Sequence, residues 1–161
     1  MPLLDIVDET YVVASPAALR KLWCDDAAWD RRFADITLRC YEDRGLLGKR
    51  WYLTGTLVGS AEVWLEEFAD GVLVHVYVRA DPAPTFGGAP LKPRQARRIR
   101  RQLLKRYARP LKRWGFAIKD TAEGDRRPGV PSVTAQPQAV GSAAKGATTI
   151  REVSDGRSDD R

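Results

Sequence analysis

The sequence is poor in the residues that most often hold metal ions or form covalent intermediates. Its 161 residues include one histidine, His75, and two cysteines, Cys24 and Cys40. A site with several histidine ligands is therefore excluded, and a Ser-His-Asp arrangement would have to use His75. The cysteine spacing matches no zinc or redox motif, and two cysteines make no disulfide framework. We predict two free, buried thiols in a reducing compartment, and no metal or other cofactor.

Targeting and membrane-spanning signals are also missing. The start, MPLLDIVDETYVV, has no basic region before its apolar residues and soon reaches Asp5 and Asp8, so it does not read as a signal peptide. No apolar run approaches the roughly 20 residues that cross a bilayer. Phe86-Gly87-Gly88 is too little glycine for a phosphate-binding loop. These absences predict a soluble cytoplasmic protein.

The end of the chain lacks the residues that build a core. All 14 aromatic residues lie before residue 121, and residues 121–161 contain no Leu, Phe, Tyr or Trp. Such a segment buries too little apolar surface to offset its conformational entropy. We predict a folded domain at residues 1–120, which is long enough for one hydrophobic core, and a disordered tail at residues 121–161.

Acidic residues are absent from residues 92–119, which hold 12 of the 27 basic residues. Residues 1–91, by contrast, hold 9 basic and 14 acidic side chains, a balance of −5. Apolar residues recur through the basic segment in steps of three and four, which is typical of one face of a helix. These residues are Ile99, Leu103, Tyr107, Leu111, Trp114 and Ile118. We predict a long helix whose apolar face covers the sheet before it, and a kink or split at about Tyr107 to Arg109 because Pro110 follows.

The segments before this helix alternate between strand and turn signals. Ser15 and Pro16 are typical of the start of a helix, and Asp25 or Asp26 fits the start of a second. The predicted order is a strand at 4–14, helices at 15–24 and about 26–33, strands at 36–41, 49–57, 61–68 and 72–79, turns at 44–48, 58–60 and 69–71, and a loop at 80–90. This order predicts an α+β fold with an antiparallel sheet of about five strands.

Two stretches resemble the START-related lipid-transfer and polyketide-cyclase superfamily (SRPBCC). The strand-to-helix entry of this superfamily is similar to the stretch YVVASPAALRKLW. Its later meander is similar to the stretch EDRGLLGKRWYLTGTLVGSAEVWLEEFADGVLVHVYVRADP. The similarity is greatest to actinobacterial proteins described as polyketide cyclase, dehydrase and lipid transport. The resemblance covers about residues 4–119. It implies the helix-grip fold, in which a curved sheet grips the C-terminal helix. Full-length members usually have two more strands, so we expect a smaller sheet and a shallower cavity.

The resemblance and the apolar pattern together predict non-enzymatic binding of a small hydrophobic molecule, lipid or polyketide-like, between sheet and helix. The loop at 80–90 and the bend at Pro110 would form the mouth. The predicted walls are Trp51, Leu53, Val63, Leu65, Val74, Val76, Leu103, Tyr107 and Trp114.

Two alternatives stay open at this stage. The first is an aromatase or cyclase in which His75 works with Glu62 or Glu66 as acid and base. The alternation of His75 with buried-type valines instead favours a solvated outer face for all three. The second is binding of an anionic membrane or of nucleic acid through the basic helix, against a solvated face that only aids solubility. Its candidate residues are Arg97, Arg98, Arg100 and Arg101.

Overall fold

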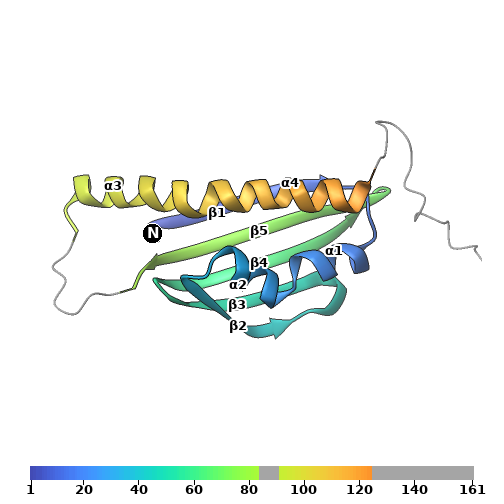
Figure 1. Ribbon diagram of the computed structural model, residues 1–161, viewed down its shortest axis with the longest axis horizontal. Helices are drawn as coiled ribbons and strands as arrows, with labels where there is room; N and C mark the ends of the chain where they lie inside the picture. Colours follow the sequence, from blue (N-terminus) through green and yellow to red (C-terminus); the bar gives the residue numbers. More distant parts are fainter. Residues whose placement is uncertain (84–90, 125–161) are drawn as a thin grey trace, which may run out of the picture.

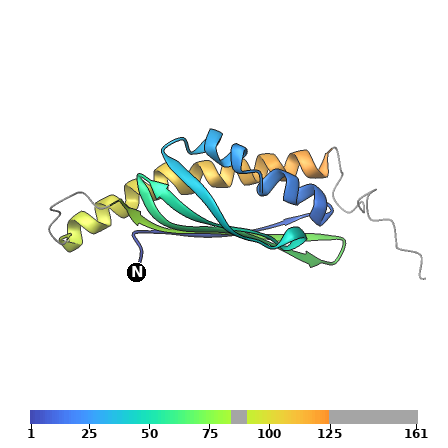
Figure 2. The same ribbon diagram turned by 90° about the horizontal axis from the view of Figure 1, so that it is seen from below.

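A computed structural model describes residues 1–83 and 91–124 as one antiparallel sheet with all its helices on one side (Figure 1, Figure 2). The sheet has five strands in the order β1-β5-β4-β3-β2, so the first strand returns to pair with the last. The long C-terminal helix runs over β1 and β5, and two short helices cover the other strands (Figure 1). The α+β helix-grip fold predicted from the sequence is confirmed.

The strands follow the predicted order with shifted ends. They are β1 (Leu4–Val12), β2 (Ile36–Asp43), β3 (Gly48–Gly55), β4 (Leu57–Phe68) and β5 (Gly71–Pro82). The predicted turn at 58–60 is wrong, because these residues lie inside β4. Gly59 is there for close packing, since a Cβ at this position would lie 2.0 Å from the carbonyl oxygen of Arg79.

The short helices begin at the predicted caps. In α1 (Pro16–Trp23) the Ser15 side chain accepts from the N–H of Ala18, and in α2 (Asp26–Arg32) the Asp25 side chain accepts from Ala27. A single turn of 3-10 helix, η1 (Gly45–Leu47), joins β2 to β3. Both α-helices turn aromatic or aliphatic side chains toward the sheet: Leu19, Trp23 and Trp29.

The C-terminal helix is continuous, so of the predicted kink or split at about Tyr107 to Arg109 the split is wrong, and the irregularity there is a π turn. It consists of α3 (Pro93–Leu103), a π-helical turn η2 (Leu104–Ala108) and α4 (Arg109–Glu123). The N–H of Arg109 donates to the carbonyl of Leu104, five residues back. A π turn widens the helix just before the proline, whose ring would otherwise crowd the carbonyl four residues earlier. The strain expected from Pro110 is taken up as one extra residue in a turn.

The hydrophobic core lies between the sheet and this helix. Trp114 on α4 packs against Trp23 and Trp29, with ring centroids 5.1 Å apart in both pairs. Trp29 also contacts Trp51 of β3 at 5.7 Å. Aromatic side chains from both short helices thus fill the space under the long one, each adding stabilisation beyond its buried area.

Three further sequence predictions concern the two cysteines, the end of the domain and the predicted mouth loop. Cys24 is buried as expected, but Cys40 is exposed, because it lies on the edge strand β2 beside a β-bulge. Helix α4 runs to Glu123, three residues past the predicted domain boundary, and the rest of the predicted tail lies outside the described residues. Of the predicted mouth loop, residues 84–90 also lie outside them.

Candidate functional site

A small apolar space remains between the sheet and the C-terminal helix. Its volume is about 10 Å³ for the centre of a water-sized sphere, the room of about one water molecule. Its lining comes from β1, α2, the sheet centre and the long helix: Ile6, Trp29, Phe33, Ile36, Leu53, Leu57, Ala61, Val78, Tyr107 and Leu111. The side chains of this domain therefore nearly fill the grip.

Two of the predicted wall residues, Leu53 and Tyr107, line this space. Leu103 is only partly buried and packs against the rim of the core. The other predicted residues are buried in the core around the space: Trp51, Val63, Leu65, Val74, Val76 and Trp114. The sequence reasoning missed Trp29 and Phe33, which α2 and its C-terminal cap place where an open hollow was expected.

Tyr107, which lines the apolar space, also belongs to a polar cluster. Tyr107 donates a short hydrogen bond from its hydroxyl to Oδ2 of Asp35. The hydroxyl of Thr56 donates to the same oxygen at 2.7 Å and lies 3.1 Å from the Tyr107 oxygen. Arg106 adds an ion pair to Asp35 at 2.9 Å. Asp35, Thr56, Tyr107 and Arg106 are called the Tyr107 cluster below.

Local backbone geometry assembles this cluster. The π turn carries Arg106 and Tyr107, and π turns occur often at functional sites. Thr56 joins β3 to β4, and its N–H donates to the Asp35 carbonyl at 3.0 Å. Gly55 has φ +105°, and a Cβ there would lie 2.7 Å from that same carbonyl oxygen. Only glycine lets the turn approach so closely in this conformation.

The cluster shifts the pKa of two of its members. Burial raises the pKa of Asp35, but hydrogen bonds from Tyr107 and Thr56 and the charge of Arg106 lower it by more, so the net pKa lies below its usual value. Burial, and then the hydrogen bond to Asp35, raises the pKa of Tyr107. An ionised carboxylate next to a neutral phenol is therefore the stable state near neutral pH.

The candidate catalytic residues lie on the opposite, outer face of the sheet. His75 stacks on Trp64 at 4.4 Å, and its ring nitrogens face carboxylates of Glu9 at 3.1 Å and Glu66 at 3.0 Å. These contacts bury His75 although its face was expected to be solvated. Since His75 alternates with the buried residues Val74 and Val76, it points away from the long helix. The ring ties three strands together.

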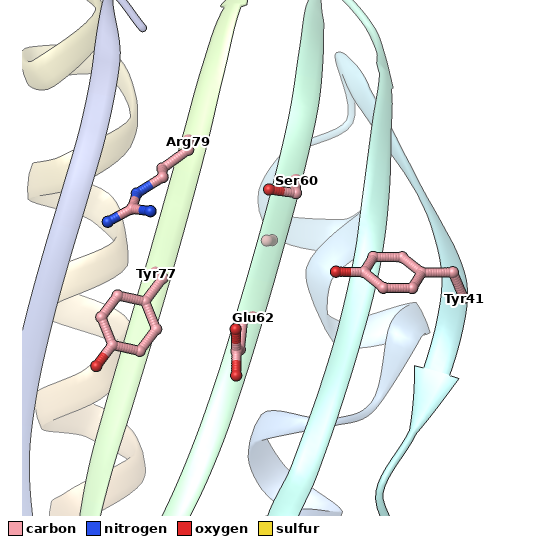
Figure 3. Close-up of a pocket in the computed structure, with 6 residues that line it drawn as sticks. Tyr41, Ser60, Glu62, Tyr77 and Arg79 are labelled. Carbon is pink, nitrogen blue, oxygen red and sulfur yellow. The ribbon is translucent and has the colours of Figure 1, made fainter. Parts of the chain in front are cut away.

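Glu62 does not join His75. Arg44 binds Glu62 at 2.7 Å, and Arg50 binds its other oxygen at 3.1 Å. Beside it, Tyr41, Ser60, Tyr77 and Arg79 line an open hollow of about 290 Å³, and in Figure 3 the helices lie behind the sheet. The cyclase alternative needs His75, Glu62 and Glu66 in the space under the helix. All three side chains lie on the outer face of the sheet instead, so the structure does not support this alternative.

The described residues contain no candidate metal-binding group and no candidate membrane-spanning helix. In residues 1–83 and 91–124, no group of three or more His, Cys, Asp or Glu side chains is placed to hold a metal ion. Within the same ranges, no helix combines the length and the apolarity needed to cross a bilayer.

Comparison with known proteins gives similarity of fold. No family model matches the chain, and no curated protein does. The Aha1 dimer from Colwellia psychrerythraea has a TM-score of 0.49 and 12% identity, over 77% of this chain and 99% of that one. TTHA0849 from Thermus thermophilus has a TM-score of 0.46 and 11% identity, over 74% of this chain and 97% of that one.

A third similar structure is the di-domain ARO/CYC StfQ from the steffimycin biosynthetic pathway. Its TM-score is 0.41 at 13% identity, and the match covers 73% of this chain and 50% of that one. At such identities the likeness concerns the course of the backbone alone. No ligand, reaction or residue role follows from it for this protein.

Proposed function

We propose that the protein binds a small hydrophobic molecule with a polar end, between the sheet and the C-terminal helix. The observation that carries the proposal is one apolar space that shares Tyr107 with a polar cluster whose pKa values are shifted. Apolar walls with a few convergent polar groups are the usual character of a small-molecule site. The entrance is the Tyr107 cluster.

The small volume sets the binding mode. A space of about 10 Å³ admits no organic ligand, so binding has to displace a side chain. Tyr107 is the natural one, because it both lines the space and belongs to the polar cluster. The ligand ring then takes the place of the Tyr107 ring.

This exchange also selects the polar end of the ligand. When Tyr107 leaves, the Asp35 carboxylate loses a hydrogen-bond donor. A hydroxyl on the ligand replaces it, whereas a carboxylate would face a like charge. We therefore favour a hydroxylated aromatic, polyketide-like molecule over a fatty acid.

The affinity of a minimal ligand should be weak. The first ligand ring only offsets the burial that the displaced Tyr107 ring loses. A second aromatic ring buries at least about 150 Å², which contributes about 4 kcal/mol before binding costs. Releasing the Tyr107 hydroxyl costs about 1.5–3 kcal/mol, most of which the ligand hydroxyl recovers. A two-ring phenol should then bind with a Kd on the order of 1 mM or below.

The test is a titration with 2-naphthol, followed by the NMR signals of the tryptophan indole N–H groups. Trp29 lines the space, while Trp64 lies on the outer face and serves as an internal control. We expect a saturable shift of the Trp29 signal, no shift of the Trp64 signal, and weaker binding of 2-naphthoate. Equal shifts at both positions, or none at Trp29, would contradict the proposal.

A filling variant provides the matched control. Ala61 lies in the lining and is buried, so Ala61→Leu places three more carbon atoms in the space. The larger side chain costs about 1–3 kcal/mol of stability, which leaves a folded protein to be checked by thermal unfolding. A folded Ala61→Leu protein that binds 2-naphthol as the parent does would also end the proposal.

A further inference from the structure

In residues 1–83 and 91–124, no element covers the first part of the C-terminal helix. None of the residues of α3 is buried, and its first turns extend past the end of the sheet (Figure 1, Figure 2). The sequence pattern had assigned the apolar stripe of the whole helix to the sheet. Ile99 and Leu103 remain partly exposed, so the stripe is covered only from Tyr107 onward.

Five cations share one face of this uncovered helix. Arg94, Arg97, Arg98, Arg101 and Lys105 follow each other at helical spacing and border the same shallow hollow. All five are exposed. Successive residues turn by about 100°, so the five lie within roughly a third of the circumference, opposite the apolar residues Ile99 and Leu103. We call this face the arginine face.

Among the described residues, cations without an ion pair are concentrated in the C-terminal helix, and the arginine face is part of this group. In the described residues, none of its five side chains forms an ion pair. Elsewhere in the same ranges most cations are paired with Asp or Glu: Arg20, Arg31, Arg44, Lys49, Arg50, Arg79, Arg106, Lys112 and Lys119. A chain that neutralises cations on its body but leaves five side by side has a surface suited to a polyanion.

We propose that the arginine face binds the phosphate backbone of double-stranded DNA, with α3 lying in the major groove. Four of the five cations are arginines, whose planar guanidinium groups bind phosphate oxygens in pairs. The 11 residues of α3 give a rod about 16 Å long, free of the body at its first turns. The major groove of B-form DNA is about 12 Å wide and admits such a rod.

Charge elsewhere in the chain orients the complex. Residues 1–91 carry a balance of −5, so phosphates repel the body and attract only the helix. Residues 120–161 hold 6 basic and 7 acidic side chains, a balance of −1, so they carry little net charge to oppose that of the arginine face. An external polyanion is therefore the fitting occupant.

An anionic membrane fits less well. A helix that lies in a membrane surface turns a broad apolar face with bulky side chains toward the lipid. On α3 the cationic side carries no apolar side chain, and the apolar side has only Ile99 and Leu103 of any size. Duplex RNA fits less well too, because its major groove is deep and narrow.

The test measures the anisotropy of a labelled DNA duplex of about 20 base pairs against salt concentration. Five phosphate contacts predict a slope of log affinity against log salt of about −4.5, which is a loss of about 500-fold between 50 and 200 mM. The triple change Arg97→Gln, Arg98→Gln, Arg101→Gln leaves two contacts, so its slope should be about −1.8. These side chains are exposed, so thermal unfolding should not change.

The matched control removes three exposed cations from other places: Lys21→Gln, Arg39→Gln and Arg113→Gln. Its net charge equals that of the first variant, and its slope should stay near that of the parent. The proposal is overturned if the duplex does not bind at 50 mM salt, or if both variants lower the slope equally. Tighter binding of an RNA duplex, or of vesicles with equal parts of phosphatidylserine and phosphatidylcholine, would overturn it as well.

Discussion

Removing one hydroxyl group from Tyr107 tests the Tyr107 cluster. In Tyr107→Phe the ring still fills its place, but Asp35 loses its short hydrogen bond and Thr56 loses a partner at 3.1 Å. A hydrogen bond to a charged group contributes about 1.5–3 kcal/mol. Asp35 keeps Thr56 at 2.7 Å and Arg106 at 2.9 Å, so we expect the lower end, about 1.5–2 kcal/mol. For a domain of this size the melting temperature should fall by roughly 5–8 °C.

The pH dependence of this loss follows from the two shifted groups. The folded pKa of Asp35 lies below its usual value of 3.8, so its contribution is present above that value and is lost as the pH falls through the folded pKa. The folded pKa of Tyr107 lies above its usual value of 10.0. Its contribution to stability is therefore present below 10.0 and is lost as the pH rises through the folded pKa. The difference between parent and variant should therefore be greatest between these limits and shrink on both sides.

Urea unfolding at several pH values, followed by far-ultraviolet circular dichroism, measures this difference. Tyr52→Phe is the control, since Tyr52 is exposed on the outer face and stacks on Tyr41. Its stability should change by less than about 0.5 kcal/mol at any pH. A Tyr107→Phe protein as stable as the control at neutral pH would refute the assigned role of the cluster.

Three further predictions concern the same core. Leu111→Ala should cost about 2–5 kcal/mol in urea unfolding and, by enlarging the space, should tighten 2-naphthol binding; unchanged binding would argue against this location. Burial raises the pKa of Cys24 to about 11, so at pH 8 a disulfide reagent should modify Cys40 quickly and Cys24 only on unfolding; two fast thiols would contradict this. Gly55→Ala should destabilise by more than about 1 kcal/mol, because its φ is +105° and its Cβ would strike the Asp35 carbonyl; a neutral effect on thermal unfolding would exclude that clash.

The sequence was a good guide where local pattern and burial agree. The alternation of His75 with valines placed it on the outer face, and the stripe through Tyr107 and Leu111 placed the long helix on the sheet. Gly59 misled because a glycine that allows strands to approach closely looks the same in sequence as a turn glycine. The true turn is at Gly55 and Thr56.

The candidate site was harder to predict, because its parts lie far apart in the chain. Asp35 and Tyr107 are separated by 72 positions, and no periodic pattern connects a carboxylate in a loop with a hydroxyl on a helix. Nor does pattern indicate how full a space is. Whether Trp29 and Phe33 leave a hollow or fill it depends on side-chain volumes in the folded core.

The extra residue in the π turn fixes the angular phase between the two ends of the C-terminal helix. Each residue of an α-helix corresponds to about 100° of rotation. Deleting Lys105 would shorten η2 to a regular turn and rotate α3 by about that angle about the helix axis, while α4 and the sheet stayed in place. The π turn therefore sets the direction in which the side chains of α3 point. The deletion of one residue there would change that direction without a change in the packing of α4.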